Sequence, residues 1–190
     1  MYFINILQVP FNLLLIGDFA YILVTFTLLW KIAKEDIQNN IISNTNIIFG
    51  STFGILTTGW LIQLKPVIFK QLYDGMAGIF ITRTLDSLTA ATFLGLLFIL
   101  IKLCPKIRLG AGDIKLAIMT GILLGFYWSF IALCAVAVSL GIFSLLMLGI
   151  NGKYTTLQQV YPFAPFWLLG AVFAVSFGGT IANILGLHLL

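Results

Sequence analysis

Apolar residues run almost without interruption through most of this chain, and they restrict the folds that it can adopt. They form six stretches, each near the length that a helix needs to cross a bilayer: Leu13–Ile32, Ile47–Leu64, Thr84–Leu103, Ile114–Phe130, Ala132–Ile150 and Phe163–Leu187. Hydrophobic residues make up 61% of the sequence and charged residues only 8%. The sequence therefore predicts an all-α, polytopic membrane protein with six transmembrane helices, in which residues 1–190 form a single membrane-embedded domain.

Basic residues are distributed unevenly between the two sets of connecting segments. One set carries Lys31, Lys34, Lys102, Lys106, Arg108, Lys115 and Lys153, and the other carries Lys65, Lys70 and Arg83. Because basic loops stay in the cytoplasm, we expect the first set inside and both termini outside. The net charge of +4 is then explained by cytoplasmic loops, and we expect no nucleic-acid partner.

Several kinds of catalytic site are disfavoured by the residues available. The single histidine, His188, falls at the outer end of the last stretch, away from the cytoplasmic loops. Cys104 and Cys134 do not form a Cys-x-x-Cys pair, so neither a zinc site nor a disulfide framework is expected. The chain also lacks a phosphate-binding or dinucleotide-binding glycine motif, and we expect no metal and no cofactor.

The expected topology divides the six carboxylates between the two sides: Asp18, Asp74 and Asp86 at the outer edge, Glu35, Asp36 and Asp113 at the cytoplasmic edge. Two carboxylates held close together do not both ionise readily. The charged one can take a proton from water while the protonated one polarises a peptide carbonyl. The residues alone leave open whether Glu35 or Asp36 pairs with Asp113, or whether both only offset Lys31 and Lys34.

A Gly-x-Gly-Asp element, residues 110–113, opens the fourth apolar stretch. An aspartate at the mouth of a membrane span is unfavourable and often marks a functional site. Gly110 and Gly112 lack Cβ atoms, which leaves room for a sharp bend or for an extended peptide beside Asp113. The alternative is an ordinary glycine-rich turn with Asp113 as a helix N-cap.

Three separated motifs occur in order along the chain. Residues 36–44 have an aspartate followed, after five residues, by Ile-Ser-Asn; residues 110–116 read Gly-Ala-Gly-Asp-Ile-Lys-Leu; residues 162–166 read Pro-Phe-Ala-Pro-Phe. Together they resemble the prepilin peptidases, or type IV leader peptidases, a family of membrane aspartic peptidases that includes the preflagellin enzymes. Ser43 replaces the family's proline, so we expect a looser turn, with Asn44 still capping the second span.

The resemblance implies an aspartic endopeptidase of the Gly-x-Gly-Asp type, with Asp36 and Asp113 as the catalytic pair. It implies supporting roles for Gly110, Gly112, Lys115, Asn44, Pro162 and Pro165. Lys115 could balance charge or contact a substrate carbonyl, or it could be a lysine that snorkels to the cytoplasm. The chain is similar to the short form of the family, without the cysteine-bearing methyltransferase segment.

The implied activity is removal of a short basic leader from prepilin, pseudopilin or preflagellin-type precursors. The implied location is the cytoplasmic (inner) membrane, in contact with the lipid bilayer, with the site facing the cytoplasm. Presenilin-like proteases share the Gly-x-Gly-Asp element, but their first aspartate follows a tyrosine deep in a span, whereas Glu35 precedes Asp36 in an expected polar loop. A small transporter or channel would place ionisable residues near the membrane midplane.

Overall fold

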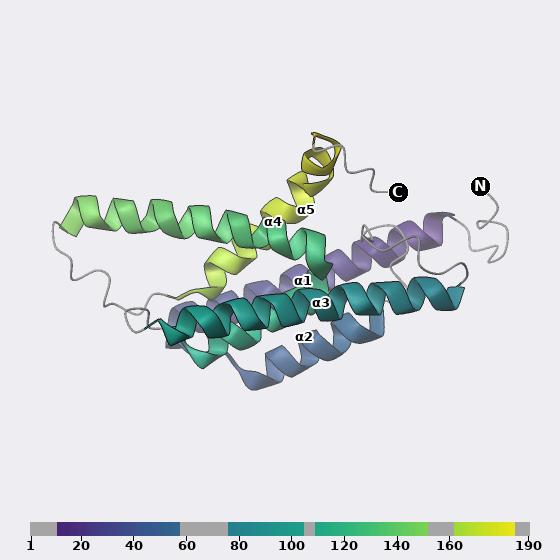
Figure 1. The fold of residues 1–190 in the computed structure, drawn as a ribbon, viewed down its shortest axis with the longest axis horizontal. Helices are drawn as coiled ribbons and strands as arrows, with labels where there is room; N and C mark the ends of the chain where they lie inside the picture. Colours follow the sequence, from purple (N-terminus) through teal and green to yellow (C-terminus); the bar gives the residue numbers. More distant parts are fainter. Residues whose placement is uncertain (1–10, 58–75, 105–108, 152–161, 185–190) are drawn as a thin grey trace.

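Helices make up most of the chain that the structure describes. The structure, a computed structural model, describes residues 11–57, 76–104, 109–151 and 162–184. Over these residues it contains the helices α1 (Phe11–Asn39), α2 (Asn44–Thr57), α3 (Met76–Leu103), α4 (Ala111–Asn151) and α5 (Ala164–Ile184), and no strand. The end of α1 and the beginnings of α2, α4 and α5 lie at one end of the bundle, together with the end of α3 (Figure 1). The predicted all-α class is confirmed.

Three helical segments within the described residues are long and apolar enough to cross a membrane: Thr84–Leu103, Ala111–Met147 and Ala164–Ile181. The first coincides with the third predicted stretch, and the last lies within the sixth. The structure thus agrees with a membrane protein at this coarser level. Part of the predicted stretch Ile47–Leu64 lies outside the described residues.

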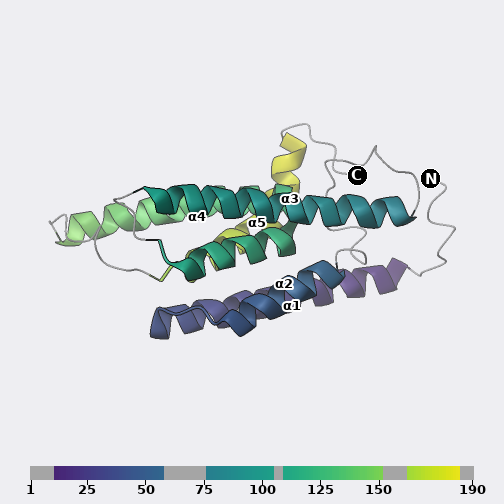
Figure 2. The same ribbon diagram turned by 60° about the horizontal axis from the view of Figure 1, so that its bottom comes forward.

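The fourth and fifth predicted stretches belong to one helical element, α4, which turns back on itself at Gly125. Gly125 has φ 74° and ψ 176°, a conformation that a residue with a Cβ rarely adopts. The first arm (111–124) runs to about the middle of α3, and the second arm (126–151) returns in the opposite direction (Figures 1 and 2). We expected the break at residue 131; it falls earlier because the glycine lets the backbone reverse there.

Side chains from two neighbouring helices bond to the backbone at this reversal. A broken helix leaves carbonyl and N–H groups without intrahelical partners. The hydroxyl of Tyr21 in α1 donates a hydrogen bond to the carbonyl oxygen of Leu123 at 2.6 Å. On the other side of the break, the N–H of Phe126 donates to Oδ2 of Asp86 in α3 at 3.2 Å. Asp86, expected at the edge of an outer loop, instead lies buried within α3.

The first arm of α4 is the centre of the packed core. It lies between α2 and α3, as Figure 2 shows, and Leu116, Met119 and Leu123 are completely buried in it. At the end of the bundle where α5 begins, Trp167 is fully buried and its ring packs against Phe98 of α3. This core joins the helix ends that carry the candidate site.

Candidate functional site

Asp36 lies in the last helical turns of α1. The helix continues to Asn39 and ends where Asn40 adopts a left-handed conformation, φ 51°, with its N–H bonded to the carbonyl of Asp36 at 2.9 Å. Asparagine tolerates this conformation better than most residues with a side chain. The expectation that Glu35 and Asp36 lie in a polar loop was therefore wrong. Asp36 is buried, with 5% of its surface exposed, although it lies near the end of the helix.

The beginning of α5 provides the partner of this buried carboxylate. The backbone N–H of Ala164 donates a hydrogen bond to Oδ2 of Asp36 at 2.9 Å. Phe163 caps the helix, because its carbonyl accepts from the N–H groups of Phe166 and Trp167. Pro165 has no N–H to offer in this first turn, and Pro162 lies just before the cap. A carboxylate at the N-terminus of a helix is stabilised by the unpaired donors and by the helix dipole.

Asp113 lies at the beginning of α4. Its Oδ2 accepts a hydrogen bond from the N–H of Gly110 at 2.9 Å, and the helix begins at Ala111. This is the arrangement of a capping box, in which the third helical residue reaches back to the residue before the helix. The alternative that Asp113 is the N-cap is thus wrong, because Gly110 occupies that position. Asp113 still contributes to the cap by accepting the N–H of Gly110. Its side chain is half-buried.

Asp36 and Asp113 lie at the same end of the bundle, where α1 ends and α4 begins. They come from the last turn of α1 and the first turn of α4, which are far apart in the sequence. Each carboxylate accepts one backbone N–H, so both are held in position by the fold.

Glu35, the other acidic residue that the sequence left open, has a different partner. Its Oε2 accepts a hydrogen bond from the side-chain amide of Asn46 at 2.7 Å. This bond ties the end of α1 to the first turn of α2. Among Glu35 and Asp36, the geometry therefore favours Asp36 as the partner of Asp113.

Lys115 and Asn44, two of the supporting residues, contact each other at the same end. The ammonium group of Lys115 donates to Oδ1 of Asn44 at 2.8 Å, and both side chains are exposed. The carbonyl of Ser43 accepts the first bond of α2, so Ser43 occupies the cap position that we expected for Asn44. The Asn44 oxygen that a cap would use points to Lys115 instead.

Gly112 allows close packing beside Asp113. A Cβ atom at this position would lie 3.3 Å from Cβ of Ile42, in the segment that joins α1 to α2. A left-handed backbone does not explain this glycine, because among the described residues only Asn40 and Gly125 have positive φ. The Ile42 contact was not foreseen, since only the fold brings residue 42 to residue 112.

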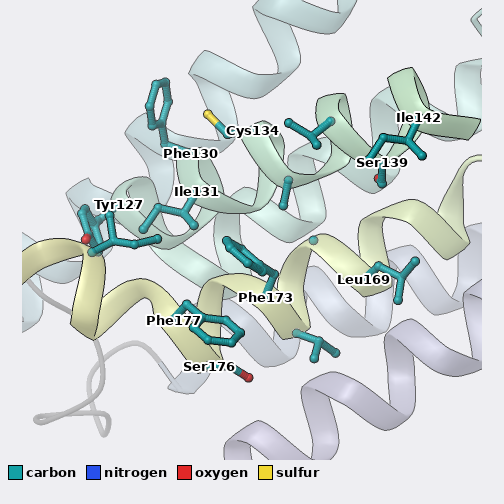
Figure 3. Close-up of a pocket in the computed structure, with 15 residues that line it drawn as sticks. Tyr127, Phe130, Ile131, Cys134, Ser139, Ile142, Leu169, Phe173, Ser176 and Phe177 are labelled. Atoms are coloured by element: carbon teal, nitrogen blue, oxygen red, sulfur yellow. The ribbon is translucent and has the colours of Figure 1, made fainter. Parts of the chain in front are cut away.

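A separate apolar groove of about 830 Å³ lies between the second arm of α4 and α5. Figure 3 shows Ile131, Ile142, Leu169 and Phe173 along it. Its lining contains no carboxylate, histidine, lysine or arginine, and its titratable residues are Tyr127 and the exposed Cys134. The candidate site is therefore the carboxylate pair and not this groove.

The remaining outer carboxylates of the sequence analysis give no further site: Asp74 and the side chain of Asp18 lie outside what the structure describes. Among the described residues, no three His, Cys, Asp or Glu side chains gather as metal ligands would. No protein-family model, curated protein or solved structure matches the chain.

Proposed function

We propose that this protein is a membrane aspartic endopeptidase in which Asp36 and Asp113 activate water. The supporting observation is that two carboxylates far apart in the sequence lie at the same end of the bundle, each anchored by a backbone N–H. Both belong to the motifs that resemble the prepilin peptidases. The proposed substrates are prepilin-like precursors with a short basic leader, and the proposed location of the site is the cytoplasmic face of the membrane.

The chemistry requires one ionised and one protonated carboxylate. The ionised group takes a proton from water, whose oxygen attacks the peptide carbonyl carbon while the protonated group donates to the carbonyl oxygen. The tetrahedral intermediate then collapses: its hydroxyl returns a proton to the second carboxylate, the C–N bond breaks, and the departing amine receives the proton that the first carboxylate took from water. The pair thus ends each turnover with one proton, as it began.

The position of the pair suits a cut at a membrane edge. Lys34, Lys102 and Lys115 are all exposed, and the last two lie near the end of α3 and the beginning of α4. Long basic side chains at helix ends extend towards the lipid headgroups and water. A site at these helix ends would lie close to the water that hydrolysis requires. The peptide to be cut would not have to enter the hydrocarbon layer.

The proposal is tested by co-expressing the chain with candidate prepilin, pseudopilin and preflagellin precursors and following leader removal by mass spectrometry. The matched variants are Asp36→Asn, Asp113→Asn and Glu35→Gln. Cleavage by wild type and Glu35→Gln, but by neither Asp variant, supports the dyad. Cleavage by both Asp variants, or none by wild type with any precursor, contradicts the proposal.

A transporter or channel is a second candidate because of one observation, the burial of Asp86 within the apolar segment Thr84–Leu103. Intramembrane carboxylates often carry protons or ions. Its bond to Phe126 gives Asp86 a structural role, so we rank this function second. Proton or cation flux into liposomes that is lost in Asp86→Asn and kept in Asp36→Asn would favour it.

A further inference from the structure

The depth of the α4 reversal follows from the length of its first arm. The arm begins at Ala111, near the exposed Lys115, and residues 111–124 span roughly 21 Å at 1.5 Å per residue. The hydrocarbon layer is about 30 Å thick and takes about 20 helical residues to cross. A tilt of the arm would reduce its depth further. If Lys115 stays at one surface of the hydrocarbon layer, the arm is therefore too short for Gly125 to reach the opposite surface.

Asp86 gives an independent measure of the same depth. It precedes Lys102, in the last turn of α3, by 16 positions, or roughly 24 Å of helix. Asp86 also meets Phe126 directly, so it lies at the level of the reversal. Figures 1 and 2 agree, since the first arm of α4 ends about halfway along α3.

An interrupted helix at this depth needs polar partners from the protein, because lipid offers none to its backbone. The hydroxyl of Tyr21 donates to the carbonyl of Leu123, and the carboxylate of Asp86 accepts from the N–H of Phe126. We propose that the reversal at Gly125 lies inside the hydrocarbon layer, and that Asp86 is the intramembrane cap that positions the second arm of α4. This inference is independent of the proposed peptidase activity.

The depth can be measured with spin labels on α3 beside Asp86. Leu85 and Leu88 are 49% and 46% exposed, and Ile41, in the segment between α1 and α2, is 68% exposed and provides the water-accessible control. Each becomes cysteine in a Cys104→Ala, Cys134→Ala background reconstituted in phospholipid vesicles. Power saturation should show Leu85→Cys and Leu88→Cys accessible to oxygen and shielded from a water-soluble nickel complex. Nickel accessibility equal to that of Ile41→Cys would overturn the proposal.

The capping role is tested by comparing two Asp86 variants of similar size. Asp86→Asn keeps an oxygen that can accept from Phe126, whereas Asp86→Leu removes it. We expect the Asn protein to unfold in detergent at nearly the wild-type midpoint, and the Leu protein several degrees lower or not to accumulate in the membrane. A Leu variant as stable as the Asn variant would overturn the role. Tyr21→Phe should likewise lower the midpoint, because it removes the hydroxyl bonded to Leu123.

Discussion

The carboxylate of Asp36 and the backbone N–H of Ala164 form a buried hydrogen bond of 2.9 Å between residues 128 positions apart. This bond joins the end of α1 to the beginning of α5 and holds the carboxylate of Asp36 in place. One side chain therefore has two roles, as a cap for a helix and as half of the proposed dyad. The two roles can be separated by mutation.

Asp36→Asn and Asp113→Asn should each abolish leader cleavage while the protein still inserts into the membrane. An amide cannot exchange the proton that the proposed reaction needs, so losses of at least about a hundredfold are expected. Cleavage is followed by mass spectrometry of a co-expressed precursor, with membrane levels checked by immunoblot. Asp18→Asn and Asp74→Asn, which the sequence places on the outer side, provide controls that should remain active. Full activity of either dyad variant would exclude that residue from the reaction.

Asp36→Ala should be less stable than Asp36→Asn, although both should be inactive. Asparagine retains an oxygen that can accept from Ala164, whereas alanine leaves a buried N–H without a partner. The cost of such a group is about 1–3 kcal/mol, which should appear as a lower thermal midpoint in detergent. If the two variants unfold at the same temperature, then the bond to Ala164 contributes little to stability.

The apolar pattern of the sequence was enough to predict helices and the segment Thr84–Leu103, because long apolar runs in a chain of this kind have few alternatives. It could not place the break in α4, since an apolar run continues across Gly125 and only the backbone angle marks the turn. For the same reason Asp86 was expected only at the outer edge of its stretch: its partner Phe126 becomes visible only when α3 and α4 are side by side.

Within the candidate site, the motifs identified Asp36 and Asp113 but not the groups that hold them. The donor to Asp36 is a backbone N–H, which has no sequence signal of its own apart from the Pro-Phe-Ala-Pro-Phe string around it. The contact of Gly112 with Ile42 is also a product of tertiary packing. Local patterns placed the beginnings of α2 and α4 within a few residues but missed the end of α1, and they do not report which helix ends meet.

Gly112→Val should reduce cleavage strongly, and Gly112→Ala should reduce it less. The added Cβ would lie 3.3 Å from Ile42, which a small shift can relieve, whereas the two further methyl groups of valine would press on the segment beside the dyad. Ile42→Ala removes the outer atoms of that neighbour and should partly restore Gly112→Val. The readout is the cleavage rate at matched membrane levels. A fully active Gly112→Val enzyme, or a double variant no better than the single one, would show that this contact does not matter.

Lys115→Ala and Asn44→Ala should have small and equal effects on stability and activity, because the contact between them is exposed. A bond of this kind contributes about 0.5–1.5 kcal/mol, so stability should fall by that amount or less in either variant. The double variant should be no worse than either single one, because both remove the same interaction. This double-mutant cycle is measured twice, from the thermal midpoints and from the kcat and KM for leader cleavage. If Lys115 instead binds the substrate carbonyl, Lys115→Ala should raise KM or lower kcat while Asn44→Ala does neither, and the effects of the two changes should then add.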